Sequence, residues 1–360
     1  QIRYVDEQNI VIMNNKILII TPGFPANEQD STCVPYIQDY VIALANKIGA
    51  DNIYIISMQY PFTRKPYQWH GINVLPSGGA NKKGFKYYFT LRRTQKRIQQ
   101  LYKSHKFIIH AFWMGEAAFA GYYASKKYLS KFVVTFMGQD VKPGNRVMRY
   151  IDHTKTYFVT LSENHDKILE KNYGFYADAI IPFPLPHAEI KTESIRKIDL
   201  LFVGSLIPVK QPEQFIKITA ALKNEFPELK ATIVGDGNLR GELESLVKEN
   251  NLQKTISFTG DLPRESVFNL MNQSKVLLHT SSFEGQCLVY AEALAQGMYV
   301  VSYNVGRIEN TDKHIVCNTV IELEQNSKNL LLQNLDYSSI KLINTENTIN
   351  DYLKLYQGVE

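Results

Sequence analysis

The feature that most constrains the fold is a regular alternation of short apolar runs with helical segments along most of the chain. The runs are continuously apolar, which is typical of parallel strands covered by helices on both faces. In the first half they are KILIITPGF (16–24), NIYIIS (52–57), KFIIHAF (106–112), KFVVTF (131–136) and TYFVTL (156–161). In the second half they are DLLFVGS (199–205), KATIVGDG (230–237), TISFTG (255–260), KVLLHT (275–280), MYVVSY (298–303) and HIVC (314–317). Strands that alternate with helices predict two doubly wound α/β domains with parallel sheets, in tandem.

A proline-rich segment separates the two series of strands. Residues 179–197, AIIPFPLPHAEIKTESIRK, contain three prolines followed by a polar stretch, which is typical of an interdomain linker. We therefore expect an N-terminal Rossmann-like domain over 1–183, a linker over 184–198 and a second Rossmann-like domain over 199–344. The terminal helix 345–360 is expected to complete the first domain.

Length and composition agree with a two-domain globular protein. The chain has 360 residues, of which 44% are hydrophobic and 21% charged. Its three cysteines are far apart and form no C-x-x-C motif, so the sequence suggests neither a disulfide framework nor a zinc site. No apolar run reaches the roughly 18–20 residues of a membrane span, and no signal peptide opens the chain. Residues 1–12 are expected to form an extension or a short added strand, and the protein is expected to be cytoplasmic.

Charge is unevenly distributed. Residues 1–190 carry 23 Lys and Arg against 14 Asp and Glu, a net charge of +9, whereas residues 191–360 carry 17 against 21, a net charge of −4. Much of the excess lies in residues 81–106, where nine basic residues interleave with aromatic and aliphatic ones. This stretch is compatible with a solvated helix face or with a surface that lies on anionic lipid. Nucleic acid is the weakest alternative, because no nucleic-acid-binding motif accompanies the stretch.

Two acids bracket the loop that follows the strand KVLLHT. In SSFEGQCLVYAEALAQG (281–297), Glu284 lies on the loop and Glu292 about one and a half turns into a helix expected to start near Gln286 or Cys287. Gly285 allows the backbone to approach a ligand closely, and the N–H groups at a helix start favour anions. Carboxylates accept hydrogen bonds from vicinal hydroxyls, so two of them can bind two polyols. From the spacing alone, a dipole-favoured helix-start Glu and a surface Glu are the better explanation of the pattern.

A second loop places a cation at the same edge of the predicted sheet. In VGSLIPVKQPEQF, Lys210 lies just before Pro212, which is suited to the first turn of a helix. A lysine beside a helix N-terminus is a phosphate-binding arrangement, although a lone lysine is more often a surface residue. VGDGNLRG predicts a tight turn at Gly235 and Gly237. It lacks the G-x-G-x-x-G spacing of a dinucleotide fingerprint.

These motifs together resemble a known family. LLFVGSLIPVK, ATIVGDGNLRGELESLV, ISFTGDLPRESV, SSFEGQCLVYAEALAQGMYVVSYNVG and the terminal YLKLY follow the order of glycosyltransferase family 4, a group of retaining enzymes of the GT-B fold. The resemblance is strongest over 199–309, where the E-x7-E element is its most specific part. It implies two Rossmann-like doubly wound parallel-sheet domains that face a cleft, with a nucleotide sugar bound by the second.

The resemblance also implies roles for particular residues. Glu292 would bind the ribose hydroxyls, Glu284 the donor sugar, and Lys210 the diphosphate. The remaining residues that would contact the nucleotide sugar are Gly23, Gly204, Ser205, Gly260, Asp261, Leu262, Gly285, Gln286, Cys287 and Leu288. His110 and Asp140 are further candidates for positioning acceptor or donor. The alternatives are a hydrogen-bonded core role for His110 and a capping role for Asp140.

The sequence departs from the family pattern at several points, most of them in the first half. The usual glycine pair before the first helix is DSTCVP, the position that commonly holds a histidine is Met137, and the usual arginine of the second phosphate loop is Ser205. These departures leave two alternatives to a divergent active enzyme. One is an inactive or regulatory protein of the same fold, and the other is a nucleotide-sugar epimerase.

The implied activity is sugar transfer from a nucleotide-diphosphate sugar to a glycan or lipid-linked acceptor, with retention at the anomeric carbon. Lys210 and helix-start amides would stabilise the leaving diphosphate, so we expect no cofactor and no metal; the chain has no D-x-D pair at a strand end. Such an enzyme would act in cell-surface polysaccharide synthesis, in the cytoplasm or at the inner face of the plasma membrane. It could contact anionic lipid through 81–106, and we expect no nucleic-acid partner.

Overall fold

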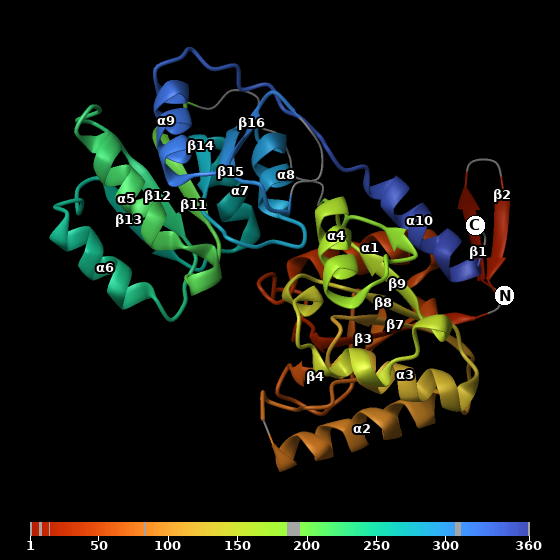
Figure 1. The fold of residues 1–360 in the computed structure, drawn as a ribbon. Coiled ribbons are helices and arrows are strands. Elements are labelled where there is room, and N and C mark those ends of the chain that lie inside the picture. The colour runs from red at the N-terminus through yellow and green to blue at the C-terminus, as the bar shows by residue number, and fades with distance from the viewer. Residues whose placement is uncertain are drawn as a thin grey trace. The chain divides into compact units, whose positions relative to one another are not determined.

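The structure is a computed structural model that describes residues 2–6, 9–13, 15–82, 84–185, 195–306 and 311–358. The chain forms two compact units, unit 1 from Gln1–Pro186 with Asn344–Glu360 and unit 2 from His187–Ile343. Each unit is built on a largely parallel sheet with helices on both faces (Figure 1). The expected pair of doubly wound α/β units is confirmed. Residues 186–194 of the predicted linker lie outside the described part of the chain.

Unit 1 contains an eight-stranded sheet in the order β10-β9-β8-β7-β3-β4-β6-β5. Its strands are β3 (Lys16–Gly23), β4 (Ile53–Tyr60), β5 (Tyr67–Trp69), β6 (Ile72–Val74), β7 (Phe107–Phe112), β8 (Phe132–Thr135), β9 (Tyr157–Thr160) and β10 (Ala179–Ile180). All neighbours are parallel except β5, which pairs antiparallel with β6 in a short edge hairpin. The sequence pattern did not predict this hairpin, because both strands have only three residues. Near the N-terminus, β1 (Ile2–Asp6) and β2 (Asn9–Met13) form a separate antiparallel pair.

Helices cover both faces of the unit 1 sheet. They are α1 (Pro35–Ile48), α2 (Phe85–Leu101), α3 (Glu116–Tyr128), α4 (Glu163–Tyr173) and α10 (Thr345–Gln357). Helices α2 and α3 lie together below the strands in Figure 1, and α1 and α10 lie together above them. The basic stretch 81–106 thus forms α2, whose buried side chains at Thr90, Thr94 and Ile98 recur at the four-residue spacing of one helix face.

Unit 2 contains a six-stranded parallel sheet in the order β13-β12-β11-β14-β15-β16. The strands are β11 (Ile198–Val203), β12 (Ala231–Val234), β13 (Ile256–Gly260), β14 (Ser274–His279), β15 (Tyr299–Tyr303) and β16 (His314–Cys317). The helices are α5 (Pro212–Lys223), α6 (Arg240–Glu249), α7 (Arg264–Asn272), α8 (Leu288–Ala295) and α9 (Val320–Leu331). Short 3₁₀ helices occupy Ala50–Asn52, Gln139–Val141, Arg146–Tyr150, His153–Lys155 and Pro208–Lys210.

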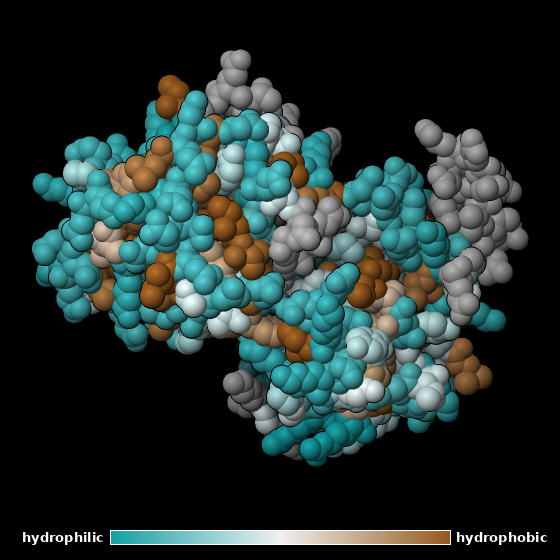
Figure 2. Space-filling view, turned by 45° about the horizontal axis from the view of Figure 1, so that its top comes forward, coloured by the Kyte–Doolittle hydropathy of each residue, from teal (hydrophilic) through white to brown (hydrophobic). Residues whose placement is uncertain are grey.

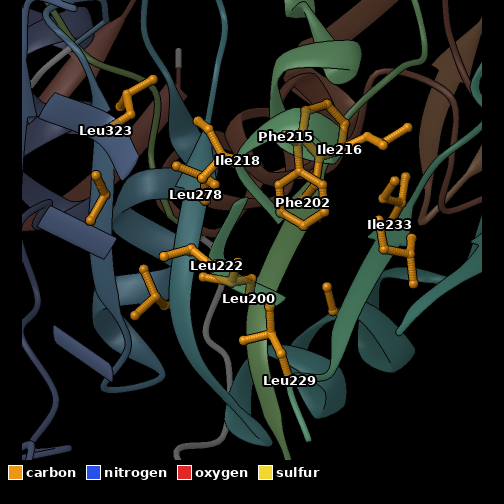
Figure 3. Close-up of a cluster of buried hydrophobic side chains, with 14 of the residues drawn as sticks. Leu200, Phe202, Phe215, Ile216, Ile218, Leu222, Leu229, Ile233, Leu278 and Leu323 are labelled. Carbon is orange, nitrogen blue, oxygen red and sulfur yellow. The ribbon is translucent and has the colours of Figure 1, made fainter. Parts of the chain in front are cut away.

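The apolar strands of unit 2 supply two cores, one on each face of the sheet. In β11, Leu200 and Phe202 pack in the core beneath α5, α6 and α9 (Figure 3), whereas Leu201 packs in the core beneath α7 and α8. Successive side chains of a strand point to opposite faces, so a strand covered on both faces must be apolar at every position. This explains why the runs in the sequence are continuous and do not alternate with polar residues.

One face of the molecule, shown in Figure 2, is largely hydrophilic, with apolar residues scattered among polar ones. Within the described ranges, no helix combines the length and apolar character needed to cross a bilayer.

Candidate functional site

The carboxyl ends of β11 and β14 mark the point in the unit 2 sheet where the strand order reverses. Strands β12 and β13 lie on one side of β11, and β14, β15 and β16 lie on the other. In open α/β sheets, ligands bind at such a switch point, beyond the carboxyl ends of the strands. The loops that follow β11 and β14 carry Lys210 and Glu284 respectively.

Hydrogen bonds between these two loops hold Lys210 beside Glu284. The Thr280 hydroxyl donates to the carbonyl oxygens of Lys210 at 3.0 Å and of Gln211 at 2.8 Å. The backbone N–H of Ser282 donates to the carbonyl of Val209 at 2.9 Å. The strand ends are adjacent in the sheet, so these bonds bring together two residues that are 74 positions apart in the sequence.

Glu284 accepts three hydrogen bonds on a single carboxylate oxygen. Oε1 is 2.5 Å from Lys210 Nζ, 3.1 Å from His279 Nε2 and 2.8 Å from Ser281 Oγ. Its side chain is only 13% exposed. No residue in the described ranges bonds to Oε2, which leaves that oxygen for a ligand hydroxyl.

The charges of the pair stabilise each other. Burial raises the pKa of Glu284, but the hydrogen bond from His279 and the charge of Lys210 outweigh it and bring the pKa down to about 2. Burial lowers the pKa of Lys210, but the Glu284 charge outweighs it, so the pKa is raised above its ordinary value. Both groups are therefore ionised across the physiological pH range. Together they place a cation and a carboxylate at one sheet edge.

His279 is a site residue that the sequence reasoning missed. It ends β14 with its side chain fully buried, and burial lowers its pKa despite the opposing effect of Glu284. The imidazole is therefore neutral at pH 7, and its bond to Glu284 assigns the proton to Nε2. A polar residue at the end of the otherwise apolar run KVLLHT was the available signal.

The same cluster contains the one group of metal-ligand type in the described part of the chain. The ligand atoms of His279, Glu284 and Cys287 all lie within 4.8 Å of one another. However, the Lys210 ammonium bonds the carboxylate oxygen that a cation would need. Burial also raises the pKa of the Cys287 thiol, which opposes formation of the thiolate that binds metals.

The second acid, Glu292, forms an ion pair with Arg264. Glu292 lies on α8 and Arg264 opens α7, and the guanidinium nitrogen is 2.6 Å from the carboxylate oxygen. Both side chains are largely buried, at 14% and 18% exposed. Arg264 follows the turn Gly260–Leu262, whose residues were expected to contact the nucleotide sugar. The sequence reasoning missed Arg264, although it lies in the quoted motif ISFTGDLPRESV.

The start of α8 agrees with the prediction to within one residue. The helix begins at Leu288, and Cys287 is its N-cap residue. The backbone N–H of Cys287, a residue expected to contact the nucleotide sugar, donates to the carbonyl of Gly306 at 3.0 Å. That donor is therefore used to hold the loop after β15. Gly285 and Gln286 lie in the loop between β14 and α8, and Leu288 opens the helix.

Gly306 is a further residue that the sequence reasoning did not assign. It has φ +58°, and a Cβ there would lie 2.5 Å from Glu284 Cβ and 2.7 Å from Cys287 N. Only glycine fits this close approach with this backbone conformation. The loop after β15 therefore packs directly on the loop that carries Glu284.

The other predicted residues of unit 2 lie at neighbouring strand ends. Gly204 and Ser205 follow β11, and the Gly204 N–H donates to the carbonyl of Val234 at 3.0 Å. Ser205 is exposed. Gly260 ends β13 and is followed by Asp261 and Leu262. All of the residues predicted to bind the nucleotide sugar, apart from Gly23, thus lie at the carboxyl edge of this sheet or on helix α8, which follows it.

In unit 1, His110 occupies a different environment from the one predicted for a catalytic residue. It lies in the middle of β7 with a fully buried side chain. Its Nδ1 is 2.6 Å from the Tyr356 hydroxyl and its Nε2 is 2.8 Å from Thr135 Oγ1. Both ring nitrogens are used inside the core, so no polar atom of His110 remains for a substrate. The alternative, a hydrogen-bonded core histidine, describes this residue.

Asp140 and Gly23 lie at the carboxyl edge of the unit 1 sheet. Asp140 accepts from the backbone N–H groups of Gly138 at 2.8 Å, Met137 at 3.0 Å and Met114 at 2.8 Å. It therefore holds together the loops that follow β7 and β8. It does not cap the next turn, which was the alternative considered for it, because the turn Arg146–Tyr150 is capped by Asn145. Gly23 is the last residue of β3.

Comparison with known proteins agrees with this geometry. The family described as Glycosyl transferases group 1 matches residues 188–333, which is most of unit 2. An uncharacterized glycosyltransferase of Haemophilus influenzae is 25% identical over 207 residues, which cover 54% of this chain and 56% of that protein. The phosphatidylinositol N-acetylglucosaminyltransferase GPI3 subunit of Saccharomyces cerevisiae is 25% identical over 118 residues, covering 33% of this chain and 26% of the subunit. The chain thus spans about half the length, or less, of these curated relatives.

Solved structures of similar fold cover almost the whole chain. Sucrose-phosphate synthase from Thermosynechococcus elongatus superposes with a TM-score of 0.69 at 15% identity, covering 96% of this chain and 99% of that one. The Anabaena protein Alr3699/HepE, solved with UDP and glucose, gives a TM-score of 0.65 at 14% identity and covers 96% and 98%. These neighbours are GT-B glycosyltransferases, and the two parallel-sheet α/β units described above have the same fold.

Proposed function

We propose that this protein is a glycosyltransferase that moves a sugar from a nucleotide-diphosphate sugar to a glycan or lipid-linked acceptor. The observation that carries the proposal is the buried Lys210–Glu284 pair at the switch point of the unit 2 sheet. A diphosphate needs a fixed positive charge, and a sugar needs hydrogen-bond acceptors for its hydroxyls. The pair supplies both within one hydrogen-bonded cluster. The match of residues 188–333 to Glycosyl transferases group 1 supports this assignment.

In the proposed reaction, the bond between the anomeric carbon and the diphosphate oxygen breaks while the acceptor hydroxyl oxygen bonds to that carbon on the same face. The hydroxyl proton leaves with the diphosphate, so the anomeric configuration is retained. Lys210 stabilises the charge that develops on the leaving diphosphate, together with N–H groups at the start of α8. Glu284 holds a hydroxyl of the transferred sugar through Oε2, while Oε1 keeps Lys210 in place. No divalent metal and no other cofactor takes part.

The ion pair Glu292–Arg264 is the part of the site that we propose binds the nucleoside. On binding, ribose hydroxyls donate to the Glu292 carboxylate, and the ion pair with Arg264 holds that carboxylate in place. Because Arg264 follows the Gly260–Leu262 turn, it also lies where the base would enter.

Cell-surface polysaccharide synthesis, in the cytoplasm or at the inner face of the plasma membrane, is the process we propose for such an enzyme.

The donor is tested first, by thermal shift with UDP-, GDP- and ADP-sugars. We then expect Glu292→Ala to weaken binding of the matching nucleotide by about 1.5–3 kcal/mol, the usual effect of losing a charged hydrogen-bond partner. Glu284→Gln should mainly lower transfer, because it removes the negative charge that orients Lys210. Calorimetry of nucleotide binding and a transfer assay with NMR detection of the anomeric configuration measure the two effects.

Two controls sharpen this test. Glu228→Ala changes an exposed carboxylate in the segment that precedes β12, at the opposite edge of the sheet, and should leave nucleotide affinity unchanged. The double variant Glu292→Ala/Arg264→Ala separates the lost hydroxyl contacts from the effect of an unpaired arginine. Unchanged affinity in Glu292→Ala would refute the nucleotide assignment. Activity that EDTA abolishes and Mg²⁺ restores would refute the metal-free mechanism. Release of free nucleotide and epimerised sugar in the absence of any acceptor would favour an epimerase.

A further inference from the structure

The unit 1 sheet has its own switch point, between β3 and β7. Strands β4, β6 and β5 lie on one side of β3, and β8, β9 and β10 lie beyond β7. The chain leaves β7 at Trp113, and the loop after β3 leads to Tyr36 in the first turn of α1. The two rings lie 6.3 Å apart at an interplanar angle of 56°. Two aromatic side chains thus stand at the place in this sheet where the doubly wound fold offers a ligand site.

Trp113 adopts a backbone conformation that a bulky side chain rarely takes. Its φ is +69°, in the left-handed region that costs free energy for residues other than glycine. Such residues persist where the surrounding structure holds them, and they concentrate at ligand sites. A glycine would turn the chain here at lower cost, so the conformation calls for a reason other than local folding.

A network of hydrogen bonds fixes this conformation. The Trp113 N–H donates to the carbonyl of Thr135 at 3.0 Å. The next residue, Met114, donates its N–H to Asp140 and accepts from the Asn145 side chain at 2.7 Å. Trp113 is therefore placed by the neighbouring strand and by the loop after β8. The backbone that carries the ring is therefore held at this edge.

The exposure and the polar atom of Trp113 favour a ligand with both apolar and hydroxyl surfaces. The side chain is only partly buried, and its Nε1–H forms no hydrogen bond with the described part of the chain. An indole face beside one free N–H donor suits a pyranose ring, which has an apolar face and a rim of hydroxyls.

We propose that Trp113 and Tyr36 form an acceptor subsite in which a pyranose ring lies on the indole and one hydroxyl accepts from Nε1–H. This inference rests on the proposed function, because the sugar bound here would be the terminal residue of the acceptor. In this inference, that sugar is recognised by stacking on the aromatic rings and by the fit of its shape to them. Asp140 acts only to position the loop.

The chain allows a direct measurement, because it has two tryptophans. Trp69 is 1% exposed and packs against Phe24, whereas Trp113 is partly exposed. Trp69→Phe removes a buried indole N–H that has no partner, so it should be tolerated and leaves Trp113 as the one emitter. Titration of this variant with the methyl glycosides of glucose, galactose, mannose and N-acetylglucosamine should give a saturable change in emission with at least one of them.

Variants at Trp113 then separate recognition from folding. Trp113→Ala should weaken glycoside binding, measured by calorimetry, about tenfold or more, and Trp113→Phe should largely restore it. In transfer assays the KM for the acceptor should rise in Trp113→Ala while the KM for the donor stays unchanged. A purely structural role predicts equal changes in both, together with a lower Tm.

The outcomes also distinguish this inference from the proposed function. If nucleotides bind but none of the four glycosides changes the emission, the subsite is refuted while the donor site stands. If Trp113→Ala binds glycosides as tightly as the parent, the subsite is likewise refuted. If glycosides bind at Trp113 but no nucleotide binds to the protein, the subsite stands and the proposed function fails.

Discussion

At the residue scale, His110 makes the stability of unit 1 depend on pH. Burial lowers its pKa to about 3, from 6.5, so the folded chain keeps the imidazole neutral where the unfolded chain binds a proton. Its stabilising effect is therefore complete above about pH 6.5. It is lost at about 1.4 kcal/mol per pH unit as the pH falls toward 3. Between pH 7 and pH 5 we expect the free energy of unfolding to fall by about 2 kcal/mol through this residue. Urea titrations followed by tryptophan emission measure it, because both tryptophans lie in unit 1. His110→Gln should remove most of this loss and the exposed His70→Gln should not; equal pH dependence in all three proteins would contradict the assignment.

At the scale of elements, the loop after β15 supports the loop that carries Glu284. Gly306→Ala should lower the stability of unit 2 by about 1–3 kcal/mol, because the new Cβ would clash with Glu284 and Cys287 at a positive φ. It should also weaken nucleotide binding, since Glu284 and Lys210 would move. Circular dichroism melting and calorimetry measure the two effects. Gly241→Ala is the matched control: it lies in α6 with no atom within 4 Å of the added Cβ, and should stabilise the helix by about 0.5–1 kcal/mol. Gly306→Ala behaving like Gly241→Ala would show that the loop does not support the site.

At the scale of the whole molecule, the basic excess of residues 1–190 leads us to propose peripheral binding to anionic membranes through α2. Arg93 and Arg97 donate to backbone carbonyls of Ser77 and Arg64, so they support the fold. Arg92 and Lys96 are exposed and are the residues that can approach lipid. At about 1 kcal/mol for each basic residue, Arg92→Ser/Lys96→Ser should weaken vesicle binding by about 2 kcal/mol, roughly 30-fold. Sedimentation with phosphatidylglycerol vesicles at low and high salt measures it, with Lys248→Ser/Lys254→Ser in unit 2 as the control. A parent protein that stays in the supernatant at both salt concentrations would exclude the membrane role and favour a soluble acceptor.

The sequence by itself determined the positions of the longer strands and helices. The spacing of apolar residues in each strand or helix reflects whether one face or both faces are buried. This spacing can be read from residues that are near one another in the chain. It also singled out the two acids and the lysine, because Lys210 and Glu284 lie in loops that follow strands and Glu292 lies in the helix after the second of these loops. The antiparallel β5–β6 hairpin was not predicted, since three-residue strands carry too little pattern.

Only the tertiary structure decided how distant residues pair. His279 and Arg264 belong to ordinary segments, and their roles appear only when β14 meets β11 and α7 meets α8. His110 is a polar residue within an apolar run, as a catalytic residue might be, yet α10 brings Tyr356 from 246 positions away to bond it inside the core. The backbone N–H of Cys287 likewise donates to the carbonyl of Gly306, because the loop after β15 packs on the loop before α8. Hydrogen bonds and ion pairs of this kind depend on the approach of separate elements, and no local pattern in the chain encodes which partner will arrive.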